Sequence, residues 1–311
     1  MDKSKLHPRN KHKGRYDFKN LIAKHPELSD FVLINKYDIE TVDFSNSRSV
    51  RALNTALLKS YYNISNWDIP NDYLCPPIPG RSDYIHYVAD LLGNSQNGLI
   101  PRGKNINCLD IGVGANCIYP IVGVSEYDWS FKGTDIDKIA LESAQKIINS
   151  NFSLKGKIDL KLQSNSNDIF AGAIGNQDYF DITICNPPFN SSMEETKASN
   201  LRKVKNLGGS KENTNFNFGG RSNELWCEGG EISFVSKMIL QSKDFANSCF
   251  WFTTLISKES NLKIIYGLLN KVGAKQTKTV EMGQGNKKSR FVAWTFLSQE
   301  QQKKWAKIKW I

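Results

Sequence analysis

Four residues at positions 186–189 combine groups suited to holding a ligand in one orientation. The segment ICNPPF places Asn186, Pro187, Pro188 and Phe189 directly after an apolar, β-branched run. Proline fixes φ and has no backbone N–H, so two consecutive prolines end a strand in a stiff turn. Such a turn holds neighbouring carbonyl and side-chain oxygens at fixed positions, beside an aromatic ring on which a nucleic-acid base can stack.

A second group with chemical potential follows an earlier apolar strand, in the segment DIGVGAN. Gly112 and Gly114 allow the backbone to turn sharply and to approach a ligand closely, next to a helix N-terminus. A nicotinamide or flavin site would need a third glycine at position 117, which is cysteine. Asp110, two residues before the first glycine, instead indicates an S-adenosylmethionine site, to which we also assign Asn116.

Three further side chains are candidates for the same cofactor. Asp135 ends the next expected strand, where a carboxylate can accept hydrogen bonds from both ribose hydroxyls, while Asp137 is expected to cap the following helix. Arg81 can clamp a cofactor carboxylate, and the alternative is a surface ion pair with Asp83. Asp168 can bind an adenine amine or simply form a turn.

The elements that would position these groups alternate between strand and helix. This alternation predicts a mostly parallel α/β sheet with helices on both faces, in which ligands collect at the carboxyl ends of the strands. We expect the helix at 117–127 to break at Pro120 and Gly123, and the prolines before Ser82 to delay the preceding helix to about that residue. The expected strands are 106–112, 131–137, 157–163, 179–185, 249–257, 274–282 and 289–297. The last two strands should form a closing antiparallel hairpin. Further helices are expected at 138–150, 228–246 and 261–273.

The chain carries a net charge of +10, which favours a polyanionic partner such as RNA. We divide it into a basic N-terminal extension at 1–74 and a catalytic domain at 75–311, with a substrate loop at 190–227 that should be mobile without RNA and close over the base. His7 and His12 are assigned to the basic arm. The candidate RNA-binding residues are Arg9, Lys11, Lys13 and Arg15 in the arm, Arg202, Lys203 and Lys205 in the loop, and Lys287, Lys288 and Arg290 in the hairpin.

Other features of the sequence exclude several classes of protein. The six cysteines are scattered without a Cys-x-x-Cys pair, so we expect reduced thiols. None of the four histidines is accompanied by other ligand residues at the spacing of a metal site, so we expect no bound metal. No apolar run approaches the ~20 residues that span a bilayer. We therefore expect a cytoplasmic protein without a membrane partner. A monomer is also expected, although no pattern in the sequence carries that expectation.

Eight segments together resemble one bacterial family, the RlmF family of 23S ribosomal RNA adenine-N6 methyltransferases. They are LHPRNKHKGRYDF, NWDIP, LCPPIPGRSDYIH, LDIGVGANCIYP, CNPPF, NFGG, ELWCEGGE and SRFVAWTF, and they cover essentially the whole chain. The resemblance implies a Rossmann-like, seven-stranded class I methyltransferase sheet, S-adenosylmethionine as cofactor, and 23S ribosomal RNA or an assembling large ribosomal subunit as partner. It also implies that residues 186–189 are catalytic and that Arg81 contacts the cofactor.

The residues alone leave other functions open. A methyltransferase acting on a guanine exocyclic amine or a protein glutamine amide would use a similar turn at 186–189. A catalytically idle RNA-binding module with the same fold is a further alternative, although no glycine or asparagine of the motifs is lost.

Overall fold

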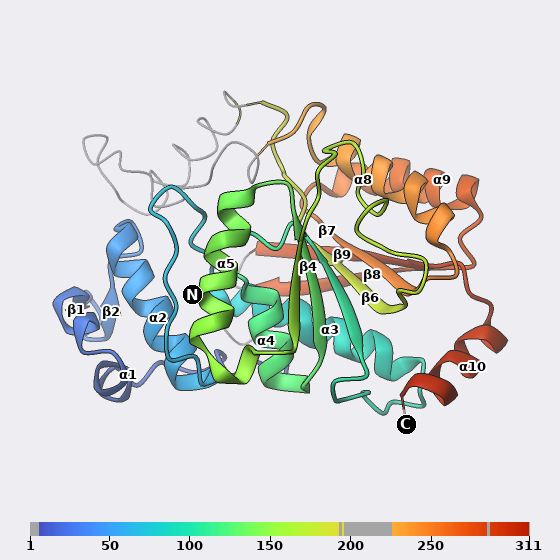
Figure 1. The fold of residues 1–311 in the computed structure, drawn as a ribbon. Coiled ribbons are helices and arrows are strands. Elements are labelled where there is room, and N and C mark those ends of the chain that lie inside the picture. Colours follow the sequence, from blue (N-terminus) through green and yellow to red (C-terminus); the bar gives the residue numbers. More distant parts are fainter. Residues whose placement is uncertain (1–5, 193–194, 196–225, 285–286, 311) are drawn as a thin grey trace.

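The computed structural model describes residues 6–192, 195, 226–284 and 287–310, and Figure 1 shows their fold. Within this part of the chain, seven strands form one sheet in the order β5-β4-β3-β6-β7-β9-β8. Neighbours from β5 to β7 are parallel, and β9 is antiparallel to both β7 and β8. The predicted seven-stranded, mostly parallel sheet with a closing antiparallel hairpin is therefore confirmed. The strands are β3 (Asn107–Ile111), β4 (Ser130–Asp135), β5 (Ile158–Leu162), β6 (Phe180–Cys185), β7 (Cys249–Ile256), β8 (Gln276–Gln284) and β9 (Lys287–Thr295).

Two apolar clusters cover the two faces of the sheet. Strand residues alternate between them, so that Ile182 joins the cluster of α3, α4 and α5, whereas Leu109 joins the cluster of α8 and α9. Helices thus pack on both faces, as Figure 1 shows. The helices are α3 (Ile78–Asn94), α4 (Ile118–Tyr127), α5 (Lys138–Ser150), α8 (Gly230–Ser242), α9 (Leu262–Val272) and α10 (Gln299–Lys309), with 3-10 turns at Phe152–Leu154, Lys243–Phe245 and Glu259–Asn261.

The N-terminal region packs against the helices α3 and α4, which cover one face of the sheet. It comprises α1 (Phe18–Lys24), η1 (Pro26–Phe31), a small hairpin of β1 (Val32–Ile34) and β2 (Glu40–Val42), and α2 (Ser47–Tyr62). One continuous apolar cluster includes Phe18 and Leu57 from this region together with Val88 and Ile121 from α3 and α4. The division of the chain near residue 75 stays a prediction.

Two helices differ from the sequence-based expectation. Helix α3 begins at Ile78, four residues before Ser82, because Pro79 lies in its first turn, where a missing N–H costs nothing. Helix α4 is continuous through Pro120, which also lies in the first turn. Gly123 does not break α4 either; it makes room for the Phe131 ring, whose Cζ would lie 2.3 Å from a Cβ at this position.

The C-terminal helix α10 was not predicted from the sequence. A buried carboxylate at the amino-terminal edge of the sheet fixes it: Asp181 accepts hydrogen bonds from the indole N–H groups of Trp305 and Trp310, each at 2.7 Å, and from the Asn107 backbone N–H. None of the helices in the described ranges is long and apolar enough to cross a bilayer.

Candidate active site

The carboxyl ends of β3 and β6 bring the two sequence motifs together. Ile111 pairs with Cys185 in the parallel ladder, so Asp110 and Asn186 lie at the same edge of the sheet. Both Asp110 oxygens and the Asn186 side-chain oxygen are buried and have no hydrogen-bond partner among the described residues. A buried polar atom left unpaired costs ~1–3 kcal/mol, so three such acceptors at one edge indicate a ligand site.

The charges around Asp110 also indicate a ligand site. Burial raises the pKa of the Asp110 carboxyl well above its usual range, and the negative charge of Asp135 raises it further. The positive charge of Arg81 opposes this shift. The site therefore holds two carboxyl groups and one guanidinium, a set able to bind a ligand with both ammonium and carboxylate groups.

Asp135 connects the glycine turn to the next helix. Its two oxygens accept hydrogen bonds from the backbone N–H groups of Gly114 and Asp137, each at 2.9 Å. Burial raises the pKa of Asp135. Asp137 caps α5 through the N–H groups of Ile139 and Ala140, which confirms its predicted role and leaves Asp135 as the candidate ribose ligand.

The glycine turn leaves space next to its backbone. Gly112 and Gly114 have φ of +74° and +65°, a region that other residues avoid. A Cβ on Gly112 would find no described atom within 4 Å, so the surface above it is open. The Asn116 side chain is already engaged, since its oxygen accepts from the Ile118 N–H at the start of α4.

Arg81 lies close enough to Asp110 for its charge to act on that carboxyl, and its contact with a cofactor stays a prediction. It projects from the first turns of α3 and donates to the Tyr119 hydroxyl at 3.1 Å, with its guanidinium over the same ring. Asp83 is buried and instead accepts hydrogen bonds from the His7 N–H and the Asn10 side chain. The alternative surface ion pair between Arg81 and Asp83 is therefore wrong.

Asp168 lies in a turn after β5. Its backbone N–H donates to the Asn165 carbonyl, and its carboxylate accepts from the Asn165 side chain at 2.7 Å. These contacts match the turn-forming alternative, while the half-buried carboxylate retains lone pairs for a ligand. Its contact with the cofactor stays a prediction.

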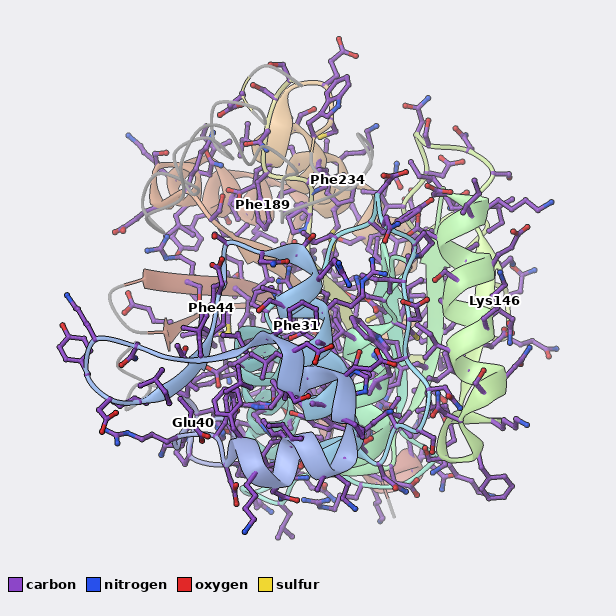
Figure 2. All side chains as sticks on the ribbon, turned by 90° about the vertical axis from the view of Figure 1, so that its left-hand side faces the viewer. Phe31, Glu40, Phe44, Lys146, Phe189 and Phe234 are labelled. Carbon is purple, nitrogen blue, oxygen red and sulfur yellow. The ribbon has the colours of Figure 1, made fainter. Side chains whose placement is uncertain are left out.

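A buried tyrosine on α3, which the sequence analysis did not single out, supports the turn at 186–189. The Tyr84 hydroxyl lies 2.6 Å from the Thr253 hydroxyl on β7 and accepts from the Cys185 N–H at 3.5 Å, directly before Asn186. The sequence did contain a signal for this residue: Tyr84 follows Arg81 by three positions, which places both on one face of the helix. Pro187 is buried and Phe189 is half-buried. Phe189 lies on the side of the molecule that Figure 2 shows.

Comparison with known proteins decides the family. Residues 1–298 match a protein family described as RNA methyltransferase. The chain belongs to this family. A Cytophaga hutchinsonii protein named ribosomal RNA large subunit methyltransferase F is 55% identical over 311 residues, covering 100% of this chain and 97% of that one. A Flavobacterium psychrophilum protein of the same name is 54% identical, with 98% and 97% covered.

Solved structures with the same fold come from human METTL16. The methyltransferase resembles the METTL16 catalytic domain in complex with a MAT2A 3′UTR hairpin, with a TM-score of 0.80 and 28% identity over 94% of this chain and 96% of that one. It also resembles the METTL16 N-terminal domain in complex with SAH, with a TM-score of 0.73 and 26% identity, covering 94% and 99%.

The basic arm of the methyltransferase is partly built into the protein. Arg9 forms an ion pair with Asp90 at 2.6 Å and donates to the Tyr127 hydroxyl, and Lys11 forms an ion pair with Glu126 at 2.8 Å. An RNA contact by either cation would compete with these pairs.

The two histidines of the arm are buried rather than available to RNA. The His7 Nε2 lies 2.8 Å from Asp90, and His12 Nε2 lies 2.8 Å from the Tyr62 hydroxyl. Their assignment to an RNA-binding arm is therefore corrected, because both rings fill the interface with α2 and α3.

The other candidate RNA ligands differ in their surroundings. Lys13 and Arg15 are exposed. Arg290 is buried and pairs with Glu259 at 3.0 Å, so binding a phosphate would require that pair to open. Arg202, Lys203 and Lys205 lie outside the described residues, as does most of the expected loop at 190–227, and the side chains of Lys287 and Lys288, at the start of β9, also lie outside them.

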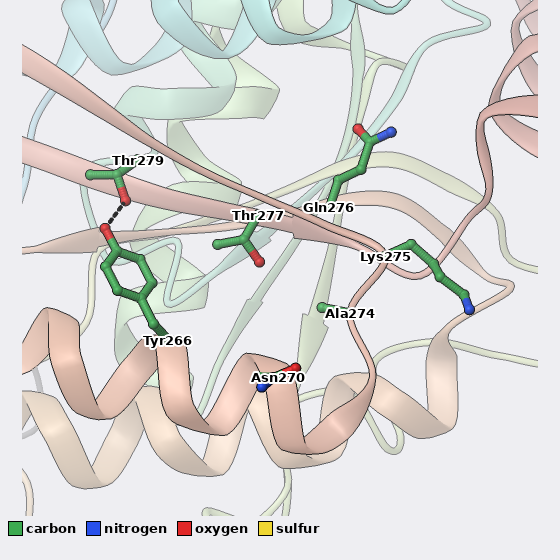
Figure 3. Close-up of a pocket in the computed structure, with 7 residues that line it drawn as sticks. All are labelled: Tyr266, Asn270, Ala274, Lys275, Gln276, Thr277 and Thr279. Atoms are coloured by element: carbon green, nitrogen blue, oxygen red, sulfur yellow. Dashed lines mark hydrogen bonds between the residues drawn. The ribbon is translucent and has the colours of Figure 1, made fainter.

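A polar hollow of about 440 Å³ lies between α9 and the edge strand β8, as Figure 3 shows. Tyr266, Asn270 and Gln276 are among its lining residues, and the Tyr266 hydroxyl is 2.6 Å from that of Thr279. The hollow contains none of the motif residues at β3 and β6. It is therefore separate from the candidate active site.

Proposed function

We propose that this methyltransferase transfers a methyl group from S-adenosylmethionine to the N6 amine of an adenosine in 23S ribosomal RNA. The observation that carries the proposal is the buried Asn186 side-chain oxygen, which has no partner among the described residues and sits in a turn stiffened by two prolines. The family and the names of the relatives support the same reaction.

The residues at the β3 edge fit the cofactor. The unpaired Asp110 oxygens can accept hydrogen bonds from an ammonium group, and Arg81 can bind a carboxylate. Asp135 can take the ribose hydroxyls, and the open backbone at Gly112 allows close approach. When bound, S-adenosylmethionine supplies an electrophilic methyl group.

The turn at 186–189 activates the amine by orienting it. The N6 lone pair of adenine is delocalised into the ring, so the amine is a weak nucleophile. The Asn186 side-chain oxygen and the Pro187 carbonyl each accept one N6 hydrogen, which directs the lone pair out of the ring plane and stabilises the positive charge that develops on nitrogen. Asn186 accepts hydrogen bonds without needing to be a base, because the N6 proton is lost after the bond has formed.

Binding of the base and of its RNA would use different groups. Phe189 provides a face for stacking, worth ~1–3 kcal/mol per base. A target adenosine in a loop costs less to extrude than one in a duplex. The exposed cations Lys13 and Arg15 are the arm residues best placed to contact phosphates, because Arg9 and Lys11 are held by carboxylates.

The decisive experiment is transfer of a tritiated methyl group to ribosomal RNA from cells that lack this gene, followed by nucleoside analysis. The expected product is N6-methyladenosine; N2-methylguanosine, or label in protein, would contradict the proposal. Asn186→Ala should lower kcat by about 10²–10³-fold with little change in cofactor affinity measured by calorimetry. The exposed Asn149→Ala on α5 is the matched control, and a fully active Asn186→Ala variant would refute the role of this side chain.

A further inference from the structure

The segment between α1 and α2 has a charge opposite to that of the rest of the chain. From Pro26 to Asn46 only Lys36 is basic, whereas the chain as a whole carries +10. We call this segment, which contains η1, β1 and β2, the acidic hairpin. Its five carboxylates, all exposed, belong to Glu27, Asp30, Asp38, Glu40 and Asp43.

The acidic hairpin also exposes large apolar side chains. Leu33 is 43% exposed, Ile34 59%, Tyr37 69% and Phe44 49%. Several exposed apolar side chains in one short, charged segment are typical of an interaction site, whereas single ones are ordinary. Figure 2 shows Phe44 and Glu40 on the same side of the molecule as Phe189.

The tip of the hairpin is ordered by its own hydrogen bonds. The Asn35 side-chain oxygen accepts hydrogen bonds from the backbone N–H groups of Tyr37 and Ile39. The Asn35 N–H donates to the Ile39 carbonyl, and the Asp38 N–H donates to the Asn35 carbonyl. Asp38 adopts φ of +56° within this turn. A partner would therefore meet a preformed surface and would lose little free energy in ordering it.

The carboxylates are not neutralised within the protein. In the described part of the chain, Asp30, Asp38, Glu40 and Asp43 make no ion pair, and Glu27 has only a long contact of 3.9 Å with His25. RNA phosphates would be repelled by this charge. The hairpin is thus the part of the N-terminal region least suited to RNA and best suited to a cationic, partly apolar partner.

We propose that the acidic hairpin docks a lysine- and arginine-rich polypeptide segment of a protein bound to the same ribosomal RNA. This inference rests on the proposed function, because a substrate made of RNA and protein places such segments beside the target. Proteins that bind RNA neutralise its phosphates with lysine and arginine. Their extended segments are therefore positively charged, which complements the negative charge of the acidic hairpin. The exposed apolar side chains pack against the aliphatic stems of these residues.

Site-specific photocross-linking tests the identity of the partner. Tyr37→p-benzoylphenylalanine is irradiated with large-subunit particles from cells that lack the methyltransferase, and the adduct is digested with ribonuclease or protease. The adduct should resist ribonuclease, be destroyed by protease, and map to a lysine- and arginine-rich peptide. Phe152→p-benzoylphenylalanine, at a site 92% exposed on the catalytic domain, is the control and should give no such adduct.

A double variant that changes charge and polarity tests how much the acidic hairpin contributes to substrate binding. Ile34 and Glu40 are cross-strand partners in the hairpin, and the double variant Ile34→Ser, Glu40→Lys should raise KM for the particle by about tenfold without changing kcat. Its affinity for protein-free ribosomal RNA should not fall. Phe152→Ser combined with Asp159→Lys is the matched control.

The outcomes separate this inference from the proposed function. Cross-linking of Tyr37 to RNA, absence of any adduct, or an unchanged KM for the particle would each overturn the docking proposal. An equal loss of affinity for protein-free RNA would overturn it as well. Failure of the proposed function would instead appear as absence of N6-methyladenosine with the unmodified protein, whatever the cross-link shows.

Discussion

The Tyr84 hydroxyl offers a single-atom test of how the fold supports the turn at 186–189. The Thr253 hydroxyl donates its hydrogen to the Thr183 carbonyl at 2.6 Å. The Tyr84 hydroxyl must therefore be the donor to Thr253, and its oxygen remains free to accept the Cys185 N–H. Tyr84→Phe removes one atom from the wall behind Asn186 and leaves the ring in place.

The expected cost follows from these contacts. The hydroxyl is fully buried, so its loss removes one short hydrogen bond and leaves the Thr253 oxygen without its donor. We expect the free energy of unfolding to fall by ~1–3 kcal/mol. Because Cys185 precedes Asn186, the acceptor should also become less well positioned, and kcat should fall by roughly tenfold or more.

Urea unfolding and single-turnover methyl transfer measure the two effects separately. Tyr87→Phe is the matched control, since its hydroxyl on the same helix makes no hydrogen bond to any described residue. Cofactor affinity, measured by calorimetry, should be nearly unchanged in both variants. A Tyr84→Phe variant with lowered stability but full kcat would show that the hydroxyl supports the core and not the turn, and an unchanged stability would refute the hydrogen-bond assignment.

Two other predictions concern charge. The raised pKa of Asp110, caused by burial and by the charge of Asp135, means that the carboxyl favours the folded state at low pH and that this contribution is lost as pH rises. Above about pH 4, where the carboxyl ionises in the unfolded chain, Asp110→Asn should therefore lose less stability than the parent chain as the pH rises in urea titrations; parallel curves would contradict this. Arg15→Ala should reduce the slope of log RNA affinity against log salt by about one unit, whereas Arg9→Ala should chiefly lower the Tm, and equal salt slopes for both variants would refute the distinction.

Much of the architecture follows from local sequence patterns. Alternating apolar runs and helical periodicity predicted the seven strands of the sheet and the helices at 138–150 and 261–273 within a few residues, because these patterns reflect burial of one face of each element. The position of Pro120 was misread, since proline disrupts only a helix interior and this one lies in a first turn.

The sequence by itself determined which residues lie at the strand ends, because glycine allows the chain to turn sharply there and proline cannot continue a strand. Only the tertiary structure decided which charges are available. His7 bonds to Asp83, which lies 76 positions further along the chain, and Arg290 is buried against Glu259, although both looked like members of basic clusters. Burial and pairing depend on contacts between distant segments, which no local pattern contains. The same reason explains why the three unpaired oxygens of Asp110 and Asn186, on which the proposed chemistry rests, could be found only in the folded chain.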